Sequence, residues 1–253
     1  MIYEFSKSLV LKHLPGGILN GLKKRHYLRT VEDISSEPDL KVVQYLVGPD
    51  DCVVDLGANI GVYTVFLSRL VKRVYAFEPI PATFEFLENN VKKLQLKNVI
   101  LERAAITDQP RVIKMSVPKQ EGVDNFYQAS VTDLGDVVVQ GKTLDQAVPE
   151  RVTFIKCDVE GHEFQCLQGA ARILEQKPAW LIEVFENNIE NVFPFMRARG
   201  YDIWVLRNEE LQLWAPGLTS VNYFFLQPEH ADRLFQAEKA RGLRFHVTQP
   251  ENA

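Results

Sequence analysis

The stretch Cys52–Tyr63 constrains the fold more than any other part of the chain. It reads Cys-Val-Val-Asp-Leu-Gly-Ala-Asn-Ile-Gly-Val-Tyr. The β-branched apolar start predicts a buried parallel strand. Gly57 predicts the turn that ends this strand, and an apolar helix is expected from about Ile60. Asp55 is then placed at the carboxyl end of a strand, where open α/β sheets bind their ligands.

Two classes of ligand bind at such a segment of strand, glycine turn and helix, and the pattern of glycines distinguishes the two classes. A dinucleotide fingerprint requires G-x-G-x-x-G, so that a pyrophosphate can lie against bare backbone. The aligned positions here are Gly57, Asn59 and Val62, which disfavours a dinucleotide oxidoreductase. Asp55-x-Gly57-x-Asn59-x-Gly61 instead resembles the S-adenosylmethionine (SAM) loop of class I methyltransferases. An ordinary βα turn without a ligand is the plain alternative.

Two more positions extend the predicted cofactor site. Arg73–Phe77 is expected to form the second strand, and Glu78 follows it 23 residues after Asp55. This spacing is close to the ~20 residues typical of an acid that binds ribose hydroxyls, although a surface acid beside a helix is the alternative. Many methyltransferases hold the adenine amino group with an acid after the third strand, but this chain has Ala105 there. We therefore expect apolar walls and backbone groups to hold the adenine.

Candidate catalytic groups lie at the ends of the fourth and fifth expected strands, 152–157 and 179–184. Methyl transfer to a hydroxyl needs a general base, and the candidates are Asp158, Glu160, His162 and Glu183.

Each candidate has a structural alternative. Asp158 could be the N-cap of the following helix, and Glu160 and Glu163 could complement its dipole. His162 could be structural, and Glu183 could pair with Lys156. No His/Cys/carboxylate spacing marks a metal site, so no metal is predicted, and Mg²⁺ held by Asp158 and Glu183 is disfavoured.

The order of elements predicts one methyltransferase domain over residues 42–253, preceded by an appendage over residues 1–41. The first 30 residues are basic. This appendage therefore either closes over substrate or touches an acidic or phosphorylated acceptor or a membrane surface, or it is a solvated face. Residues 115–142 interrupt the alternation of strands and helices. They are expected to be an inserted hairpin or lid near the acceptor, or a plain extension of the sheet edge.

Composition excludes several classes of protein. A formal net charge of −4 argues against a nucleic-acid binder. No apolar run is long enough for stable membrane insertion. The three cysteines lack metal spacing and are expected to be buried in a reducing compartment, which predicts a cytoplasmic protein. Whether the chain forms a homo-oligomer is left open.

Over roughly residues 42–226 the chain resembles the FkbM-type methyltransferase family. The matching residues are Val54–Gly61, Phe77–Pro79, Thr143–Asp145, Phe154–Glu163, Leu167-x-Gly169-Ala170 and Leu181–Val184. The resemblance implies a Rossmann-like class I methyltransferase fold, with a mostly parallel seven-stranded sheet, helices on both faces and an antiparallel edge hairpin. It also implies SAM as cofactor and O-methylation of a hydroxyl on a sugar, polyketide or other small metabolite, as in secondary metabolism. An N-methyltransferase and a non-catalytic SAM-binding or scaffold protein remain alternatives.

Overall fold

A computed structural model describes residues 16–120, 123–124, 129–132, 134–241, 243 and 245–248. The elements in chain order are α2 (Gly16–Thr30), η2 (Ile34–Ser36), α3 (Leu40–Leu46), β1 (Cys52–Leu56), α4 (Val62–Ser68), β2 (Arg73–Phe77), α5 (Pro81–Lys93), β3 (Val99–Glu102), β4 (Ala105–Ile106), β5 (Arg111–Ser116), β6 (Lys119–Gln120), β7 (Val123–Asp124), β8 (Ser130–Val131), β9 (Val137–Lys142), α6 (Leu144–Ala147), β10 (Phe154–Cys157), α7 (Glu163–Gln168), α8 (Ala171–Leu174), β11 (Ala179–Glu183), α9 (Glu186–Arg197), β12 (Asp202–Arg207), β13 (Glu210–Leu213), β14 (Asn222–Leu226), α10 (Pro228–Arg241) and β15 (His246–Val247).

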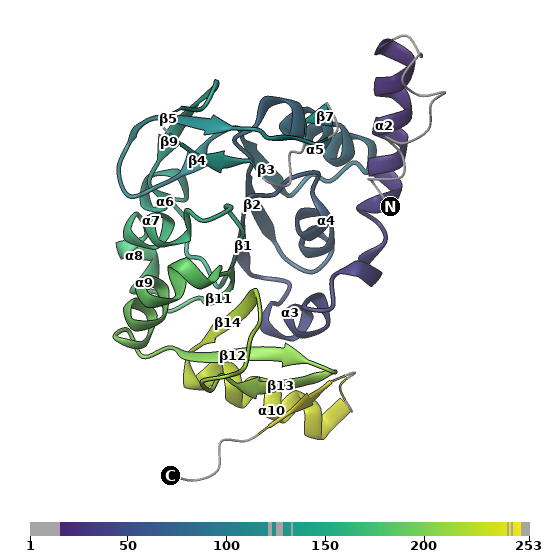
Figure 1. The fold of residues 1–253 in the computed structure, drawn as a ribbon. Helices are drawn as coiled ribbons and strands as arrows, with labels where there is room; N and C mark the ends of the chain where they lie inside the picture. The colour runs from purple at the N-terminus through teal and green to yellow at the C-terminus, as the bar shows by residue number, and fades with distance from the viewer. Residues whose placement is uncertain are drawn as a thin grey trace.

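The main sheet is mixed. Within the described residues it has nine strands in the order β15-β13-β12-β14-β11-β10-β1-β2-β3. The five strands from β3 to β11 are parallel, and β14 and β12 then continue the sheet as antiparallel strands (Figure 1). The expected antiparallel pair is therefore present, but it does not lie at the sheet edge, and the expected count of seven strands is wrong. The short strands β13 and β15 extend the sheet beyond β12.

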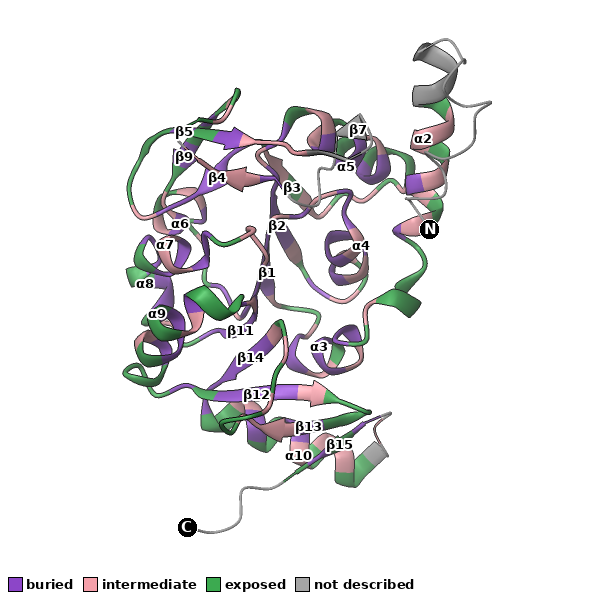
Figure 2. Ribbon diagram, in the orientation of Figure 1, coloured by how far each residue is buried: buried purple, intermediate pink, exposed green. Residues whose placement is uncertain are grey.

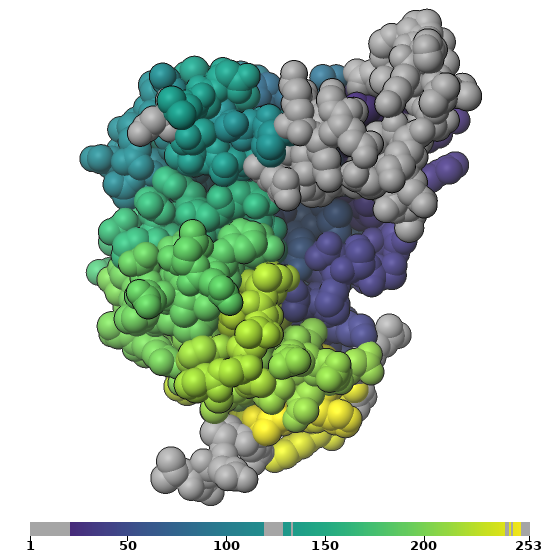
Figure 3. Space-filling model, viewed as in Figure 1, coloured from purple at the N-terminus to yellow at the C-terminus, as the bar shows by residue number. Residues whose placement is uncertain are grey.

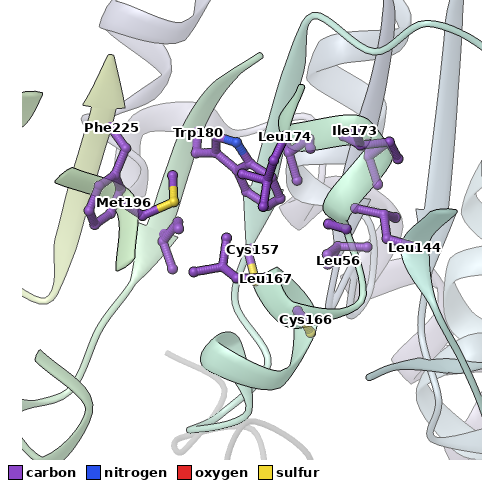
Figure 4. Close-up of a cluster of buried hydrophobic side chains, with 14 of the residues drawn as sticks. Leu56, Leu144, Cys157, Cys166, Leu167, Ile173, Leu174, Trp180, Met196 and Phe225 are labelled. Carbon is purple, nitrogen blue, oxygen red and sulfur yellow. The ribbon is translucent and has the colours of Figure 1, made fainter. Parts of the chain in front are cut away.

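Helices cover both faces of this sheet because its strands are apolar on both sides. One core joins the sheet to α6, α7, α8 and α9, and Figure 4 shows its side chains, among them Leu56, Cys157 and Trp180. A second core joins the opposite face to α3, α4 and α10. Figure 2 shows the central strands as buried and the outward sides of the helices as exposed. The three cysteines are buried and free, as expected.

One predicted helix is divided in two. The apolar spacing from Phe164 to Leu174 predicts a single amphipathic helix, but α7 ends at Gln168 and α8 begins at Ala171. Gly169 lies at the break, where a Cβ would be 2.1 Å from the backbone oxygen of Thr107. The close approach of this neighbouring loop leaves no room for a side chain at the break.

Residues 115–142 take part in a second, smaller sheet. Its strand order is β4-β9-β5-β8, and β6 and β7 form a separate pair. The described part of this excursion is therefore a small sheet rather than an extension of the main sheet's edge. Residues 121–122, 125–128 and 133 of the excursion lie outside the described residues.

The described part of the N-terminal appendage lies against the domain. Helix α2 packs on α5 through Tyr27 and Phe86, whose ring centroids are 4.7 Å apart. Further along, Asn222 at the start of β14 donates a hydrogen bond of 2.7 Å to Asp39. In Figure 3 the purple N-terminal residues adjoin the yellow-green residues near β14. Residues 1–15 of the appendage lie outside the described residues. Among the helices that the structure describes, none is long and apolar enough to cross a membrane.

Candidate active site

A cavity of about 450 Å³ opens at the carboxyl ends of β1, β2, β10 and β11. Its lining combines residues of the main sheet, the small sheet and the N-terminal segment. All the predicted site residues line it except Gly61; those that do are Asp55, Gly57, Asn59, Glu78, Ala105, Asp158, Glu160, His162 and Glu183. The topology brings these residues together because the carboxyl ends of parallel strands share one edge of the sheet.

The turn after β1 has no space for a side chain at Gly57. This residue has a φ of +74°, and a Cβ there would lie 1.7 Å from the backbone oxygen of Asp158. The turn is held by two hydrogen bonds to the Phe77 carbonyl, from the N–H groups of Gly57 (3.0 Å) and Ala58 (2.9 Å). Gly57 therefore lets the ends of β1, β2 and β10 approach one another.

Gly61 has a packing role outside the cavity. It adopts a φ of +102° as the N-cap of α4. A Cβ at this position would lie 2.7 Å from the Cδ1 atom of Leu87 in α5. The glycine thus permits close contact between α4 and α5.

Two buried carboxyl groups face the cavity from the first two strands. Glu78 is 6% exposed and accepts hydrogen bonds from the N–H groups of Asn59 (3.0 Å) and Ile80 (2.8 Å). Asp55 is 2% exposed and accepts one from the Thr64 hydroxyl at 2.5 Å. Burial raises the pKa of Glu78 to about 7 and that of Asp55 to about 6. These carboxyls become fully ionised only above neutral pH or beside a cation.

An apolar wall continues the cavity beyond Glu78. Its members come from the loop after β2 and from the small sheet; they are Ile80, Ala105, Ile106, Met115, Ala129 and Val131. Ile80, Ala105, Met115 and Ala129 belong to one buried cluster. The residues of the 115–142 excursion that line the cavity therefore lie at its apolar end.

A carboxyl cluster lies at the ends of β10 and β11. Asp158, Glu160 and Glu183 each place an oxygen within 4.8 Å of the others. Lys156 is 3% exposed, and its ammonium forms an ion pair of 3.1 Å with Asp158, not with Glu183 as the sequence suggested. This ammonium already neutralises one of the three carboxylates that a metal ion would need.

The three carboxyls differ in acidity. Burial alone would raise the pKa of Asp158, but the charge of Lys156 and hydrogen bonds with Glu183 and Lys156 together lower it. Burial, followed by a hydrogen bond with Asp158, raises the pKa of Glu183 to about 9. Burial and the charge of Asp158 raise the pKa of Glu160 to about 7. Glu160 also has a φ of +54°, which is a strained conformation for a non-glycine residue and is often found at functional sites.

The other residues of this turn are held by structural contacts. His162 is the N-cap residue of α7, so Asp158 is not. The His162 Nε2 lies 3.0 Å from the Thr107 hydroxyl, and burial lowers the pKa of this histidine. Glu163 is fully buried, and its carboxylate accepts hydrogen bonds from the Gly161 N–H and the Asn188 amide, both 2.9 Å long. Glu163 therefore fixes the shape of the turn that presents Glu160.

Several cavity residues were not predicted from the sequence. Glu37 and Asn222 reach it from segments far from the recognised motifs, and Tyr63 reaches it from the start of α4. No local pattern identifies the first two, because only the tertiary fold brings residues 37 and 222 to this edge. Tyr63 follows the glycine turn directly, so its position relative to the motif was a usable signal.

Comparison with known proteins agrees with this architecture. A crystal structure of methyltransferase FkbM from Methylobacillus flagellatus superposes with a TM-score of 0.53 at 18% identity, covering 70% of this chain and 43% of that chain. The fold is therefore the α/β fold of class I methyltransferases. The model of the methyltransferase FkbM domain matches residues 55–203. Because this match spans more than half of the chain, the chain belongs to the FkbM methyltransferase family.

Two relatives match part of the chain at higher identity. Methyltransferase 1 of Beauveria bassiana is 27% identical over 147 residues, which cover 48% of this chain and 59% of that protein. Hexuronic acid methyltransferase AglP of Haloferax volcanii is 27% identical over 177 residues, which cover 66% of this chain and 72% of that protein. The chain thus spans about three fifths of the length of the first relative and less than half of the FkbM structure.

Proposed function

We propose that the chain is a SAM-dependent methyltransferase that methylates a hydroxyl group of a sugar or another small metabolite. The family match supports methyl transfer. The assignment of the site rests on one observation: a single cavity has two chemically different parts. In one part Glu78 and Asp55 lie beside an apolar wall, and in the other the cluster of Asp158, Glu160 and Glu183 lies at the ends of β10 and β11.

The first part of the cavity suits SAM. Glu78 would accept hydrogen bonds from the ribose hydroxyls, since a carboxylate can accept from two donors at once. Asp55 would face the ammonium of the amino-acid end, with Gly57 and Asn59 lining that part of the turn. Ala105 and the other members of the apolar wall would contact the adenine. When bound, SAM supplies a methyl group that is already electrophilic.

Glu160 is the best candidate for the general base. A base works best when its pKa is close to the pH at which the enzyme operates, and that of Glu160 is about 7. Asp158 is ionised and paired with Lys156, which makes it a weak base but a good group to orient the acceptor. Glu183 keeps its proton at neutral pH and uses it to donate a hydrogen bond to Asp158. His162 contacts Thr107 and is assigned a structural role.

The acceptor class rests on two lines of support. The relative from Haloferax volcanii is named as a methyltransferase of a hexuronic acid, which favours a sugar as acceptor. A carboxyl base beside the acceptor suits a hydroxyl, because an oxygen must lose its proton near the transition state. An amine acceptor needs less help from a base, so N-methylation is the second candidate.

Calorimetric titration with SAM, S-adenosylhomocysteine and NADH tests the cofactor. We expect micromolar binding of the first two compounds and none of NADH. The Glu78→Gln variant should bind SAM about 10-fold more weakly, because charged hydrogen bonds to the ribose are lost. Binding of NADH alone, or unchanged SAM affinity in Glu78→Gln, would contradict the assignment.

A further inference from the structure

One part of the cavity is rich in hydrogen-bond acceptors; we call it the acceptor end. It comprises Glu37, Tyr63, Lys156, Asp158, Glu160, Glu183 and Asn222. These residues face one another. The charges of Lys156 and Asp158 both act on the Glu37 carboxyl, and Glu183 and Asn222 are paired in register on β11 and β14.

The acceptor end has little positive charge to offer a ligand. Lys156 is the only lysine or arginine that lines the described part of the cavity, and its ammonium is already paired with Asp158. Glu37, Glu160 and Glu183 have no ion-pair partner among the described residues. At neutral pH Glu183 is protonated, but Asp158 is ionised and Glu160 is partly ionised. An anionic group placed here would be repelled by these charges in a partly desolvated site, where such repulsion is weakly screened.

Two further polar atoms at this end lack partners. The Tyr63 side chain is only 8% exposed. Its hydroxyl is close enough to the Glu37 carboxyl to oppose the burial that raises the pKa of Glu37, but it makes no hydrogen bond of normal geometry among the described residues. The Oδ1 atom of Asn222 is likewise buried and unsatisfied, although the Nδ2 atom of the same amide donates to Asp39. Buried polar groups in native proteins nearly always have partners. We therefore expect a bound ligand to supply the hydrogen-bond partners that these two atoms lack.

The chemistry of the unsatisfied groups defines that ligand. Carboxylates and an amide oxygen accept hydrogen bonds, and a tyrosine hydroxyl can accept as well as donate. A ligand that satisfies them must present several O–H or N–H donors close together. A carboxylate or phosphate group would add another acceptor and another negative charge.

We propose, on the basis of the methyl transfer proposed above, that the acceptor end takes a polyhydroxy compound rich in hydrogen-bond donors and without a negative charge near the methylated oxygen. Neutral sugar rings and amino sugars meet this requirement. Uronates, sugar phosphates and nucleic acids do not. The acceptor would therefore differ in charge from the acid for which the Haloferax volcanii relative is named.

Labelling an unfractionated mixture tests this inference without a prior choice of acceptor. The full chain is incubated with SAM carrying a labelled methyl group and with a metabolite, glycolipid and RNA extract of the cells that produce it. Part of the product is treated with mild alkali, which releases methanol from a methyl ester but not from a methyl ether or methylamine. The rest is hydrolysed to monomers, which are separated by anion exchange at pH 7.

We expect a label that is stable to alkali, on a monomer that the anion exchanger does not retain. Label released as methanol would show a carboxylate acceptor and overturn the inference. Label on a retained monomer or on RNA would overturn it too. Absence of label from every fraction would instead contradict the proposed methyl transfer.

The Tyr63→Phe variant tests the same inference at one atom. It removes the unsatisfied hydroxyl and keeps the ring that lies beneath Lys156. We expect the KM for the identified acceptor to rise about 3- to 10-fold, as for loss of one hydrogen bond, with unchanged SAM affinity and no fall in Tm. Tyr75→Phe is the matched control, because its hydroxyl is already bonded to Glu150 at 2.8 Å; that variant should leave the KM unchanged. A lower Tm with an unchanged KM in Tyr63→Phe would show that the hydroxyl serves the fold instead.

Discussion

The ammonium of Lys156 lies 3.1 Å from the carboxylate of Asp158, where β10 ends and the cavity begins. Burial and this contact together give the three carboxyls of the cluster different acidities. Asp158 stays ionised beside its partner, Glu183 retains a proton that it shares with Asp158, and Glu160 is left with a pKa near neutrality. Three neighbouring carboxyls are thereby given three different protonation states.

Glu160→Gln should lower kcat roughly 100-fold or more, the usual contribution of a general base. In the wild type, kcat should rise with pH through about 7 as Glu160 loses its proton. Steady-state kinetics with the identified acceptor measure both effects. His162→Asn is the comparison and should lower kcat less than about 10-fold, since general-base catalysis is not lost. A larger loss of kcat in His162→Asn than in Glu160→Gln would assign the role of general base to His162 instead.

SAM affinity should depend on pH because two buried carboxyls must ionise to hold it. The pKa of Glu78 is raised to about 7 and that of Asp55 to about 6, so lowering the pH through this range protonates both. We expect binding roughly 10-fold weaker at pH 5.5 than at pH 7.5. Calorimetry at the two pH values measures the difference, which should shrink in Glu78→Gln. Equal affinity at both values would exclude ionised carboxyls from the binding site.

The ligand-free protein should become less stable as pH rises from 6 to 9. The pKa values of Glu78, Glu160 and Glu183 in the folded protein are about 7, 7 and 9, above the ordinary value near 4.3 for an unfolded chain. The stability that their protonation supplies is complete below that ordinary value and is lost as pH rises through the folded values. After allowance for solvent screening, we expect a loss of about 1–2 kcal/mol in the free energy of unfolding. Urea unfolding at pH 6, 7.5 and 9 measures it, and a rise over this range would contradict the prediction.

Gly57→Ala should destabilise the protein by about 3 kcal/mol or more, because the new methyl group meets the Asp158 backbone and the φ is positive. Gly161→Ala is a matched control. Its φ is also positive, at +93°, but no atom lies within 4 Å of the new Cβ. It should cost about 1 kcal/mol from backbone strain alone. Equal losses in urea unfolding would mean that close approach of the strand ends is not what requires Gly57.

Removal of divalent metal should leave methyl transfer unchanged. The carboxyl cluster could in principle hold a cation, but Lys156 already neutralises Asp158 and Glu183 is protonated at neutral pH. Activity should therefore be the same in EDTA and in added Mg²⁺. A loss of activity in EDTA that Mg²⁺ restores would assign a metal to Asp158, Glu160 and Glu183.

The central strands were predictable because they are short apolar runs bounded by strong turn signals. The second strand was predicted at Arg73–Phe77, as observed. The division between α7 and α8 was not predictable, since Gly169 is required by a loop that is distant in the sequence. Strands β13 and β15 were missed for a similar reason. They are short, and each depends on a neighbour for pairing.

The same distinction applies to the candidate site: some of its residues could be predicted from the sequence, and others could not. Asp55, Glu78 and Asp158 follow strands whose order in the sheet can be inferred from sequence, so their convergence on one edge could be predicted. The partner of Lys156 could not be predicted, because a choice between Asp158 and Glu183 depends on side-chain geometry. Glu37 and Asn222 lie outside every recognised motif, and their approach to the cavity is a property of the tertiary fold.

The family model covers residues 55–203, whereas Thr30, Ser36, Glu37 and Asn222 complete the cavity wall from either side of that stretch. The residues proposed to bind SAM therefore lie within the stretch that the family model covers, whereas Glu37 and Asn222 of the acceptor end lie in the segments that flank it. Such an arrangement is modular: exchange of the flanks between relatives can change the acceptor while the cofactor site is inherited intact. We accordingly expect changes in the segments of this chain before and after residues 55–203 to alter the choice of substrate without altering SAM binding.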